Sequence, residues 1–500
     1  MLITDPNLWA NTLFAHAELN DPRRTRRLVR ISASLAQNVG QSIMQSARSP
    51  ADMEAAYRFM RNSAIRAEHI DDAGFASTAD MAAQFNILLA LEDTTSLNFS
   101  YPSIRDDLGH ISTSQQARGL QAHSVLLYAP EAVQLVGLIA QQRWTRDITT
   151  MGKNRRATQT PYQAKESYKW EQTSRQMAER LGPLMQRVIS VCDREADLIE
   201  YLAYKHQQGQ RFIVRSAKSR RIEEADSKLY AFGCELAVAG ERSVNVPQKG
   251  GRKARQVQCD IRYAPVTIKV PTNKQGESIS LFYVSCIEQG SPDGLSWHLL
   301  TSEPVTNAEQ AQQIVMHYEK RWLIEDFHKA WKSSGTRVEA LRLQTRANLE
   351  KAVVILSFVA VRIQQLRFTG LQDEDEGIML PKSVTKGKII KTVTGEGQKR
   401  YDFQFVNKRG YKITVEGLSE KFNPEYWNYA KLISGVLRYR MPVAHVIKLV
   451  NQLQLTSETL NTWRVGVERA LKKYLYEENG IDNLENGIDY KETEDEIDEQ

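Results

Sequence analysis

The chain has 500 residues, of which 41% are hydrophobic and 25% are charged. This is the composition of an ordinary globular protein with room for two or three domains. The longest apolar run, residues 352–361, is too short to span a bilayer and predicts a buried helix. The amino end lacks a basic start followed by an apolar run, which argues against a signal peptide. We therefore expect a cytoplasmic protein with no membrane partner.

The formal net charge of +6 conceals an uneven distribution. Residues 477–500 contain eleven Asp or Glu and one Lys, so this tail carries −10 and residues 1–476 carry +16. A body this basic favours a phosphate-rich partner. Segment 476–500, in contrast, is acidic and poor in apolar residues, so we expect a disordered tail.

The four cysteines are not arranged for a zinc site or a disulfide framework. None of them has the paired spacing that a structural zinc site needs, and nothing in the sequence indicates secretion. We expect free, buried thiols in a reducing compartment. They are Cys192, Cys234, Cys259 and Cys286.

The first predicted helix is rich in arginine and begins after Asp21, with Pro22 in its first turn. Arg23, Arg26, Arg27 and Arg30 would share one of its faces. This face is either a solvated basic surface or a surface that binds DNA phosphates, with Arg27 and Arg30 as candidate contacts. We place a helical domain at residues 1–70.

Two predicted strands lead directly into acidic residues. The apolar run 87–91 is followed by Glu92 and Asp93, and the run 187–192 is followed by Asp193. A carboxylate at the end of a central strand is a common metal ligand, but an Asp that merely opens a turn is commoner. Rival carboxylates lie close by in each case. They are Glu92 beside Asp93, and Glu195 and Asp197 beside Asp193.

The order of the predicted elements indicates an α/β fold. Strands at 122–128 and 133–140 and a polar helix at about 161–180 separate the two acidic strand ends. Three strands, a helix and a fourth strand match a ribonuclease H-like core, where the first and fourth strands each supply a carboxylate. We place this core at residues 71–369, with a β-rich subdomain inserted at 220–305 because alternating runs and Gly-containing turns fill that stretch.

The stretch 317–332 predicts a single amphipathic helix. Tyr318, Arg321, Glu325 and Lys332 would share an arc of about 60°, opposite an apolar face that packs on a core. Such a row can bind a divalent metal through the carboxylate and phosphates through the cations. The alternative is a solvated helix face with an ordinary Arg–Glu pair.

The chain beyond residue 369 is less informative. Residues 370–425 have an irregular composition rich in Gly, Lys and Asp, and helical patterns resume at about 424–474. We expect a helical region at 370–475, which is where the family described below has its dimerisation domain.

Several of these motifs resemble one family. The pattern Tyr318-x2-Arg321-x3-Glu325-x6-Lys332, the Asp93-Thr94-Thr95 motif and the DREAD motif that begins at Asp193 resemble bacterial cut-and-paste transposases of the IS-four superfamily, Tn-five-like branch. The arginine-rich helix and the sequence Tyr57-Arg58-Phe59 resemble the family's DNA-end-binding domain. The resemblance covers residues 20–367 well and the remainder weakly.

The resemblance implies specific roles. Asp93, Asp193 and Glu325 would be catalytic and would hold two Mg²⁺ ions, for which Mn²⁺ can substitute. Other residues would contact DNA, with Trp297 left open between a base-stacking surface and a core indole. They are Tyr318, Arg321, Lys332, Arg215 and Trp297, in addition to Arg27 and Arg30.

The implied function is a bacterial DNA transposase. It would cleave DNA strands, form hairpins and transfer the ends of an insertion element to a target. Its partners would be terminal inverted repeats, target DNA and a second copy of the chain in a synaptic complex. A structure-selective DNA nuclease and a non-catalytic DNA-binding regulator remain the alternatives.

Overall fold

The computed structural model describes residues 3–114, 116–151, 160–246, 254–274, 276–291 and 293–372, together with three strands between residues 386 and 415. The chain divides into two compact units, Met1–Gln372 and Asp373–Gln500, which are described separately. Across these described residues, no helix combines the length and apolar character needed to cross a membrane.

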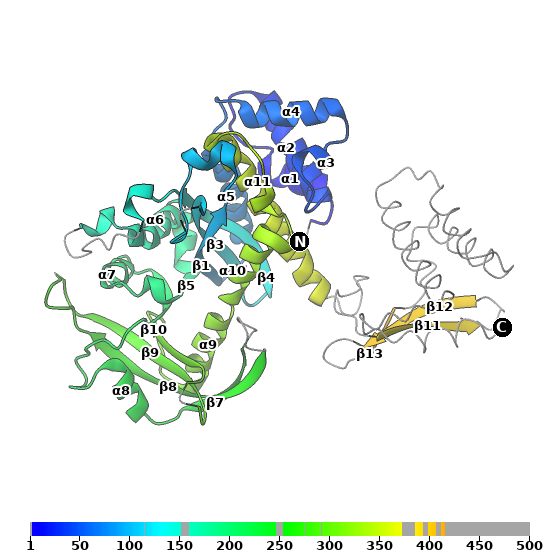
Figure 1. Cartoon of the computed structure of the whole chain (residues 1–500). Coiled ribbons are helices and arrows are strands. Elements are labelled where there is room, and N and C mark those ends of the chain that lie inside the picture. Colours follow the sequence, from blue (N-terminus) through cyan, green and yellow to red (C-terminus); the bar gives the residue numbers. More distant parts are fainter. Residues whose placement is uncertain are drawn as a thin grey trace, which may run out of the picture. The chain divides into compact units, whose positions relative to one another are not determined.

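Five helices begin the first unit (Figure 1). Asp21 caps the arginine-rich helix α2 as predicted, because its side chain accepts a hydrogen bond of 2.8 Å from the backbone N–H of Arg23. Helix α5 continues past residue 70 and packs on β4, so the predicted boundary of the helical domain falls inside a helix. The helices are α1 (Pro6–Phe14), α2 (Pro22–Gln37), α3 (Ile43–Ser46), α4 (Pro50–Arg61) and α5 (Ala67–Ala82).

A mixed sheet forms the centre of this unit. Strand β1 lies between antiparallel β3 and parallel β5, while β4 pairs with β3 and β6 pairs in parallel with β5. The predicted order of three strands, a helix and a fourth strand is therefore present. These elements are β1 (Leu88–Asn98), β2 (Gly109–His110), β3 (Arg118–Ala129), β4 (Gln134–Trp144), α6 (Lys169–Leu181), β5 (Val188–Cys192), α7 (Ile199–Gln207) and β6 (Arg211–Arg215).

Strand β1 is longer than predicted. It continues through Asp93 to Asn98, because the backbone after Leu91 still pairs with β3. Pairing between β1 and β5, however, ends at Leu91 and Val191. Asp93 therefore lies where the parallel part of the sheet ends, although it does not end its own strand.

The predicted β-rich insert does not form a separate sheet. Strands β7 (Gly240–Val246), β8 (Arg255–Ile268), β9 (Ile279–Glu288) and β10 (Ser296–Thr301) extend the central sheet, since β10 pairs with β6. One helix, α8 (Leu229–Glu235), lies in the same stretch. The insert is thus attached directly to the strand that follows the Asp193 region.

The predicted single helix at 317–332 is wrong in detail. Helix α9 (Ala308–Glu319) ends before Arg321, α10 (Trp322–Lys329) follows, and a π-helical turn covers Ala330–Ser334. Tyr318 and Lys332 thus lie outside the helix that carries Glu325, whereas Arg321 and Glu325 keep their i,i+4 contact at 3.2 Å.

Two helical layers cover the sheet (Figure 1). Helices α10 and α11 (Arg346–Gln372) lie on one face, and α6 and α7 lie on the other. The apolar run 352–361 is buried in α11, as predicted. One thiol differs from expectation, because Cys234 is exposed while the other three cysteines are buried and free.

The second unit contains a three-stranded antiparallel sheet. Its strands are β11 (Lys386–Val393), β12 (Lys399–Val406) and β13 (Lys412–Val415). The prediction of a helical region is therefore wrong for these strands, where alternating β-branched and aromatic residues favour extended backbone. The predicted helices at 424–474 and the acidic tail lie outside the described residues.

Candidate active site

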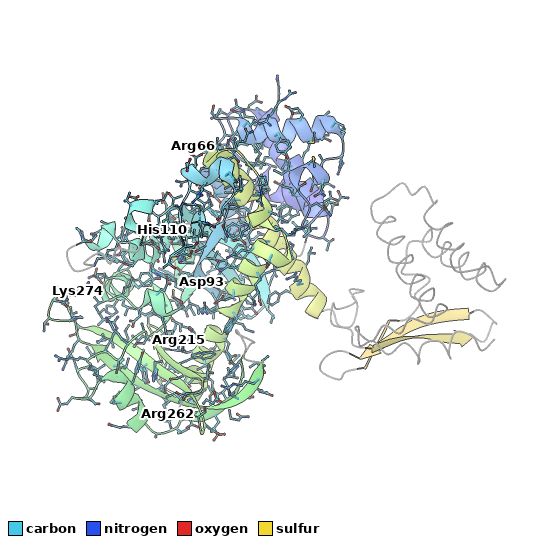
Figure 2. The ribbon with its side chains drawn as sticks, in the orientation of Figure 1. Arg66, Asp93, His110, Arg215, Arg262 and Lys274 are labelled. Carbon is cyan, nitrogen blue, oxygen red and sulfur yellow. The ribbon has the colours of Figure 1, made fainter. Side chains whose placement is uncertain are left out.

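Two of the three predicted catalytic carboxylates converge on one guanidinium. Arg321, just before α10, places Nη2 at 3.2 Å from Glu325 Oε1 and Nη1 at 3.9 Å from Asp93 Oδ2. His328, one helical turn beyond Glu325, places Nδ1 at 3.7 Å from the same Asp93 oxygen. Figure 2 labels Asp93 on the central sheet and Arg215 where β6 ends. Strand β1 and helix α10 are thus held together by a charged cluster.

The pKa values of the acidic residues reflect this crowding. The pKa of Asp93 is raised to about 7, mainly by burial; the charge of Arg321 lowers it, and the charges of Glu325 and Asp193 add to the rise. Burial also raises the pKa of Asp193, against the hydrogen bond from the Glu195 backbone and the charge of Arg321. The mutual effects of Asp93, Asp193, Glu325 and Arg321 place all four in one electrostatic cluster.

The three acids of the DREAD motif have different environments. Asp193 follows β5 and its Oδ1 accepts a 2.8 Å hydrogen bond from the Glu195 backbone. Glu195 is exposed and pairs with Lys169 at 3.1 Å. The fully buried Asp197 carboxylate accepts hydrogen bonds from Arg220 and from the backbone N–H of Ala217. Of the three, only Asp193 is left for the Arg321 cluster.

The donor set of this cluster suits a hard divalent cation. Carboxylate oxygens are the ligands that Mg²⁺ prefers, and like-charged carboxylates that raise one another's pKa are stabilised by a cation between them. Within the described residues, no three Asp, Glu, His or Cys side chains are already gathered at metal-binding distance. Instead, the Arg321 guanidinium lies between Asp93 and Glu325.

Lys332 is held at the same end of β1. Its Nζ donates a 2.7 Å hydrogen bond to the carbonyl of Ser96 and lies 3.7 Å from Glu339 Oε1. Glu339 in turn accepts a 2.8 Å hydrogen bond from the Asn98 backbone. The π-helical turn that carries Lys332 is thus tied to the strand that carries Asp93.

The predicted DNA-contacting aromatic residues are buried. Tyr318 is 4% exposed and Trp297 is 5% exposed, and their rings pack edge to face with centroids 5.1 Å apart. The Arg215 guanidinium donates a 2.9 Å hydrogen bond to the carbonyl of Ser296, and its charge acts on the Tyr318 hydroxyl. Two interpretations were left open for Trp297, and its burial favours the core indole over the base-stacking surface.

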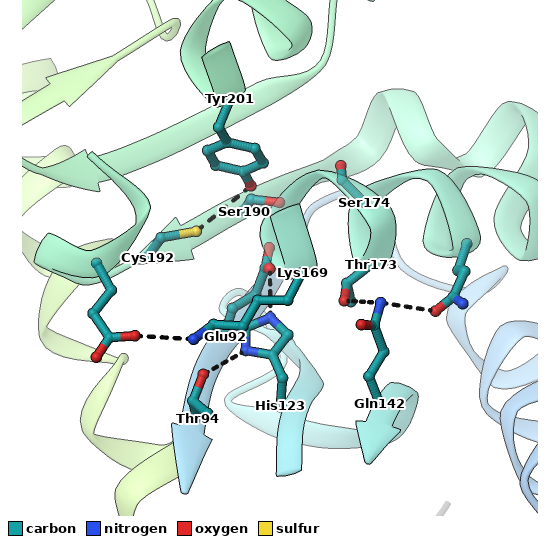
Figure 3. Close-up of polar contacts among 12 residues, drawn as sticks. Glu92, Thr94, His123, Gln142, Lys169, Thr173, Ser174, Ser190, Cys192 and Tyr201 are labelled. Carbon is teal, nitrogen blue, oxygen red and sulfur yellow. Dashed lines mark hydrogen bonds and ion pairs between the residues drawn. The ribbon is translucent and has the colours of Figure 1, made fainter. Parts of the chain in front are cut away.

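A buried polar layer lies behind the active-site strand (Figure 3). Glu92 is 0% exposed and lies 3.6 Å from His123 Nε2, while His123 Nδ1 is 3.0 Å from the Thr94 hydroxyl. The ammonium of Lys205 donates a 2.9 Å hydrogen bond to the Ser190 hydroxyl in the same layer. Glu92 is therefore committed to the interior, which removes it as a rival to Asp93.

The two candidate DNA contacts on α2 differ. Arg27 pairs with Asp52 of α4 at 3.0 Å and is partly buried, whereas Arg30 is exposed. Both line a cavity of about 100 Å³ between α2 and the segment 43–56. Arg30 is therefore available to a ligand, and Arg27 is already neutralised.

His328 was not predicted from the sequence. It faces Asp93, and burial lowers its pKa to about 3, assisted by the charges of Lys332, His123 and Arg321. The imidazole is neutral at pH 7 in consequence. Its position three residues after Glu325, on the same helix face, is the sequence signal that could have identified it.

Comparison with known families agrees with this geometry. Residues 6–65 match the family described as transposase DNA-binding, and residues 158–362 match the family described as transposase DDE domain. The chain has the DNA-binding and DDE domains of a transposase. Asp193 and Glu325 lie inside the matched part of the DDE domain, and Asp93 precedes it.

Two further similarities carry less weight. Residues 338–476 match a family described as NrdJ homologue C-terminal domain, most of which lies outside the described residues. A piggyBac transposase, solved by cryo-EM in a synaptic complex with hairpin DNA, is similar at 10% identity over 76% of this chain and 74% of that chain. Its TM-score of 0.31 is too low to support a conclusion about the DDE domain.

Proposed function

We propose that this chain is a metal-dependent DNA transposase of the cut-and-paste type, built on a ribonuclease H-like core. The observation that carries the proposal is the convergence of Asp93 and Glu325 on Arg321, with the charge of Asp193, which follows β5, acting on the same guanidinium. The matches to transposase DNA-binding and DDE families support it. The finer assignment to the Tn-five-like branch rests on the resemblance of the sequence motifs.

In this proposal the three carboxylates hold two Mg²⁺ ions. When bound, such a pair supplies Lewis-acid activation of a water or 3′-hydroxyl and stabilises the departing oxygen. The same site can then perform strand hydrolysis, hairpin formation and strand transfer without a covalent enzyme intermediate. Aspartate and glutamate suit this role because Mg²⁺ prefers hard oxygen ligands and must be able to exchange its water ligands for phosphate oxygens.

Arg321 has two possible anionic partners in this scheme. With no metal present, its charge compensates Asp93 and Glu325. If the carboxylates were compensated by bound cations instead, the Arg321 guanidinium could bind a phosphate of the DNA strand, for which its planar fork is well suited. Lys332, fixed on β1, would bind a neighbouring phosphate.

The experiment is cleavage of labelled duplex DNA that carries the inverted repeats flanking the element, in the presence of Mg²⁺ or Mn²⁺. We expect a strand nick and then a hairpin-ended product from the parent chain, and neither from Asp93→Asn. Cleavage without hairpins and without dependence on the repeats would support a structure-selective nuclease instead. The homodimer remains a prediction, which sizing of the DNA complex by light scattering would test.

A further inference from the structure

Two exposed cations flank the carboxylates on the side of β5 and β6. Arg194 directly follows Asp193, and Lys218 lies three residues after Arg215. Both side chains are exposed, and within the described ranges neither has a hydrogen-bond or ion-pair partner. The nearby acids do not neutralise them, because Glu195 is paired with Lys169 and Asp197 with Arg220.

A single buried carboxylate ties the two loops together. Asp197 ends the short turn that begins with Arg194. Its Oδ2 accepts a 2.8 Å hydrogen bond from the backbone N–H of Ala217 and a 3.3 Å hydrogen bond from the Ser216 hydroxyl. The Ser216 hydroxyl also lies 2.9 Å from the carbonyl of Lys218, so its single proton can be donated to either acceptor. The backbone on which Lys218 sits is therefore fixed relative to the turn that carries Arg194.

Strand register brings these loops to the active site. Cys192 of β5 is opposite Val214 of β6, so Asp193 and Arg215 leave neighbouring parallel strands at the same edge. The charge of Arg194 reaches Arg215 and His298, where it adds to the effect of burial in lowering their pKa values. Lys332, which is hydrogen-bonded to the Ser96 carbonyl of β1, adds a third cation on the strand next to β5.

We propose that Arg194 and Lys218 form a phosphate-binding site for the DNA strand that crosses the carboxyl ends of β5 and β6. Two unneutralised cations beside a carboxylate cluster suit a polyanion, because they offset the repulsion between its phosphates and the acids. Asp197 is a positioning residue for this site, since it contacts the two loops and is itself shielded from solvent. The inference rests on the proposed function and adds a contact surface to it.

The test is the salt dependence of binding to a fluorescent 40-base-pair duplex of mixed sequence, without divalent metal. The slope of log K against log salt is negative, and each lost phosphate contact reduces its magnitude by about 0.9. Below, a lower slope means a smaller magnitude. We expect Arg194→Ala and Lys218→Ala each to lower the slope by about one, and the double variant to lower it by about two. Because both side chains are exposed, melting temperatures should remain at the parent value.

Two controls separate the possible failures. Arg187→Ala removes a cation at the opposite end of β5 and should leave the slope unchanged. Arg30→Ala, in the DNA-binding domain, should lower it. An unchanged slope in the double variant, or an equal loss in Arg187→Ala, would overturn the site while leaving the proposed function standing. Absence of salt-dependent DNA binding by the parent chain would instead overturn the proposed function.

Discussion

Glu92 and Asp93 are adjacent in the chain but face opposite sides of strand β1. Asp93 points to Arg321 and His328, whereas Glu92 lies in the buried layer with His123. Successive side chains of a strand point to opposite faces of the sheet, so the sheet itself separates the two carboxylates. One acid is therefore available for chemistry and its neighbour for the stability of the core.

This separation predicts different effects of two neighbouring substitutions. Glu92→Gln should lower the free energy of unfolding by about 1–3 kcal/mol, because it leaves buried polar groups poorly matched. Asp93→Asn should leave the unfolding free energy within about 1 kcal/mol of the parent and abolish cleavage. Urea unfolding and DNA cleavage per folded molecule measure the two effects. The same loss of cleavage in both folded variants would argue against the assignment.

The ion pair between Arg27 and Asp52 predicts unequal contributions from the two candidate arginines of α2. Arg30→Ala should lower the salt slope of DNA binding by about one, and Arg27→Ala should lower it less, because Arg27 is already paired. Asp52→Ala should tighten binding at low salt by freeing Arg27. Fluorescence anisotropy at several salt concentrations would measure all three. Equal slopes in the two arginine variants would show that the pair does not persist on DNA.

The burial of Trp297 predicts a loss of stability before any specific loss of chemistry. Trp297→Ala should lower the free energy of unfolding by roughly 3–5 kcal/mol, as for a core indole. Nicking, hairpin formation and melting temperature should then fall together. Trp297→Phe should restore most of each. Normal melting with a selective defect in hairpin formation would instead support the base-stacking role.

A buried imidazole predicts acid sensitivity of the fold. Burial lowers the pKa of His317 from 6.5 to about 4, so the unfolded chain binds a proton in this interval that the folded protein does not. Above pH 6.5 the imidazole is neutral in both states and the unfolding free energy is at its full value. It falls as the pH drops from 6.5 to 4, where only the unfolded chain takes up the proton, and this loss is complete below about pH 4. The loss amounts to at most about 3 kcal/mol.

Replacement of this side chain should therefore weaken the pH dependence. We expect His317→Leu to reduce the fall in unfolding free energy between pH 7.5 and pH 4.5, and not to abolish it, because burial also lowers the pKa values of His298 and His328. His206→Leu, which removes an exposed imidazole on α7, serves as the control and should leave the pH dependence as in the parent. A parent-like slope for His317→Leu would show that other groups account for the acid sensitivity.

The sequence predicted the strands and helix caps that carry the site residues better than it predicted which side chains contact one another. Asp193 follows β5 and Asp21 caps α2, because apolar runs and cap residues are local signals. The helix around Glu325 was predicted as continuous, since the break at Arg321 involves no Pro or Gly that would signal it. Residue periodicity also could not show that Trp297 is buried, because its burial depends on Tyr318 of a distant helix.

A comparison of Asp193→Asn with Glu195→Gln tests most directly which carboxylate of the DREAD motif belongs to the active site. Glu195 is 62% exposed and pairs with Lys169, while Asp193 belongs to the Arg321 cluster. In a metal-dependent cleavage assay, Asp193→Asn should reduce the rate by about 10³-fold or more, equivalent to ~4 kcal/mol in the transition state. Glu195→Gln should cleave within about threefold of the parent rate. The reverse result, with Glu195→Gln inactive and Asp193→Asn active, would contradict the assignment of the active site.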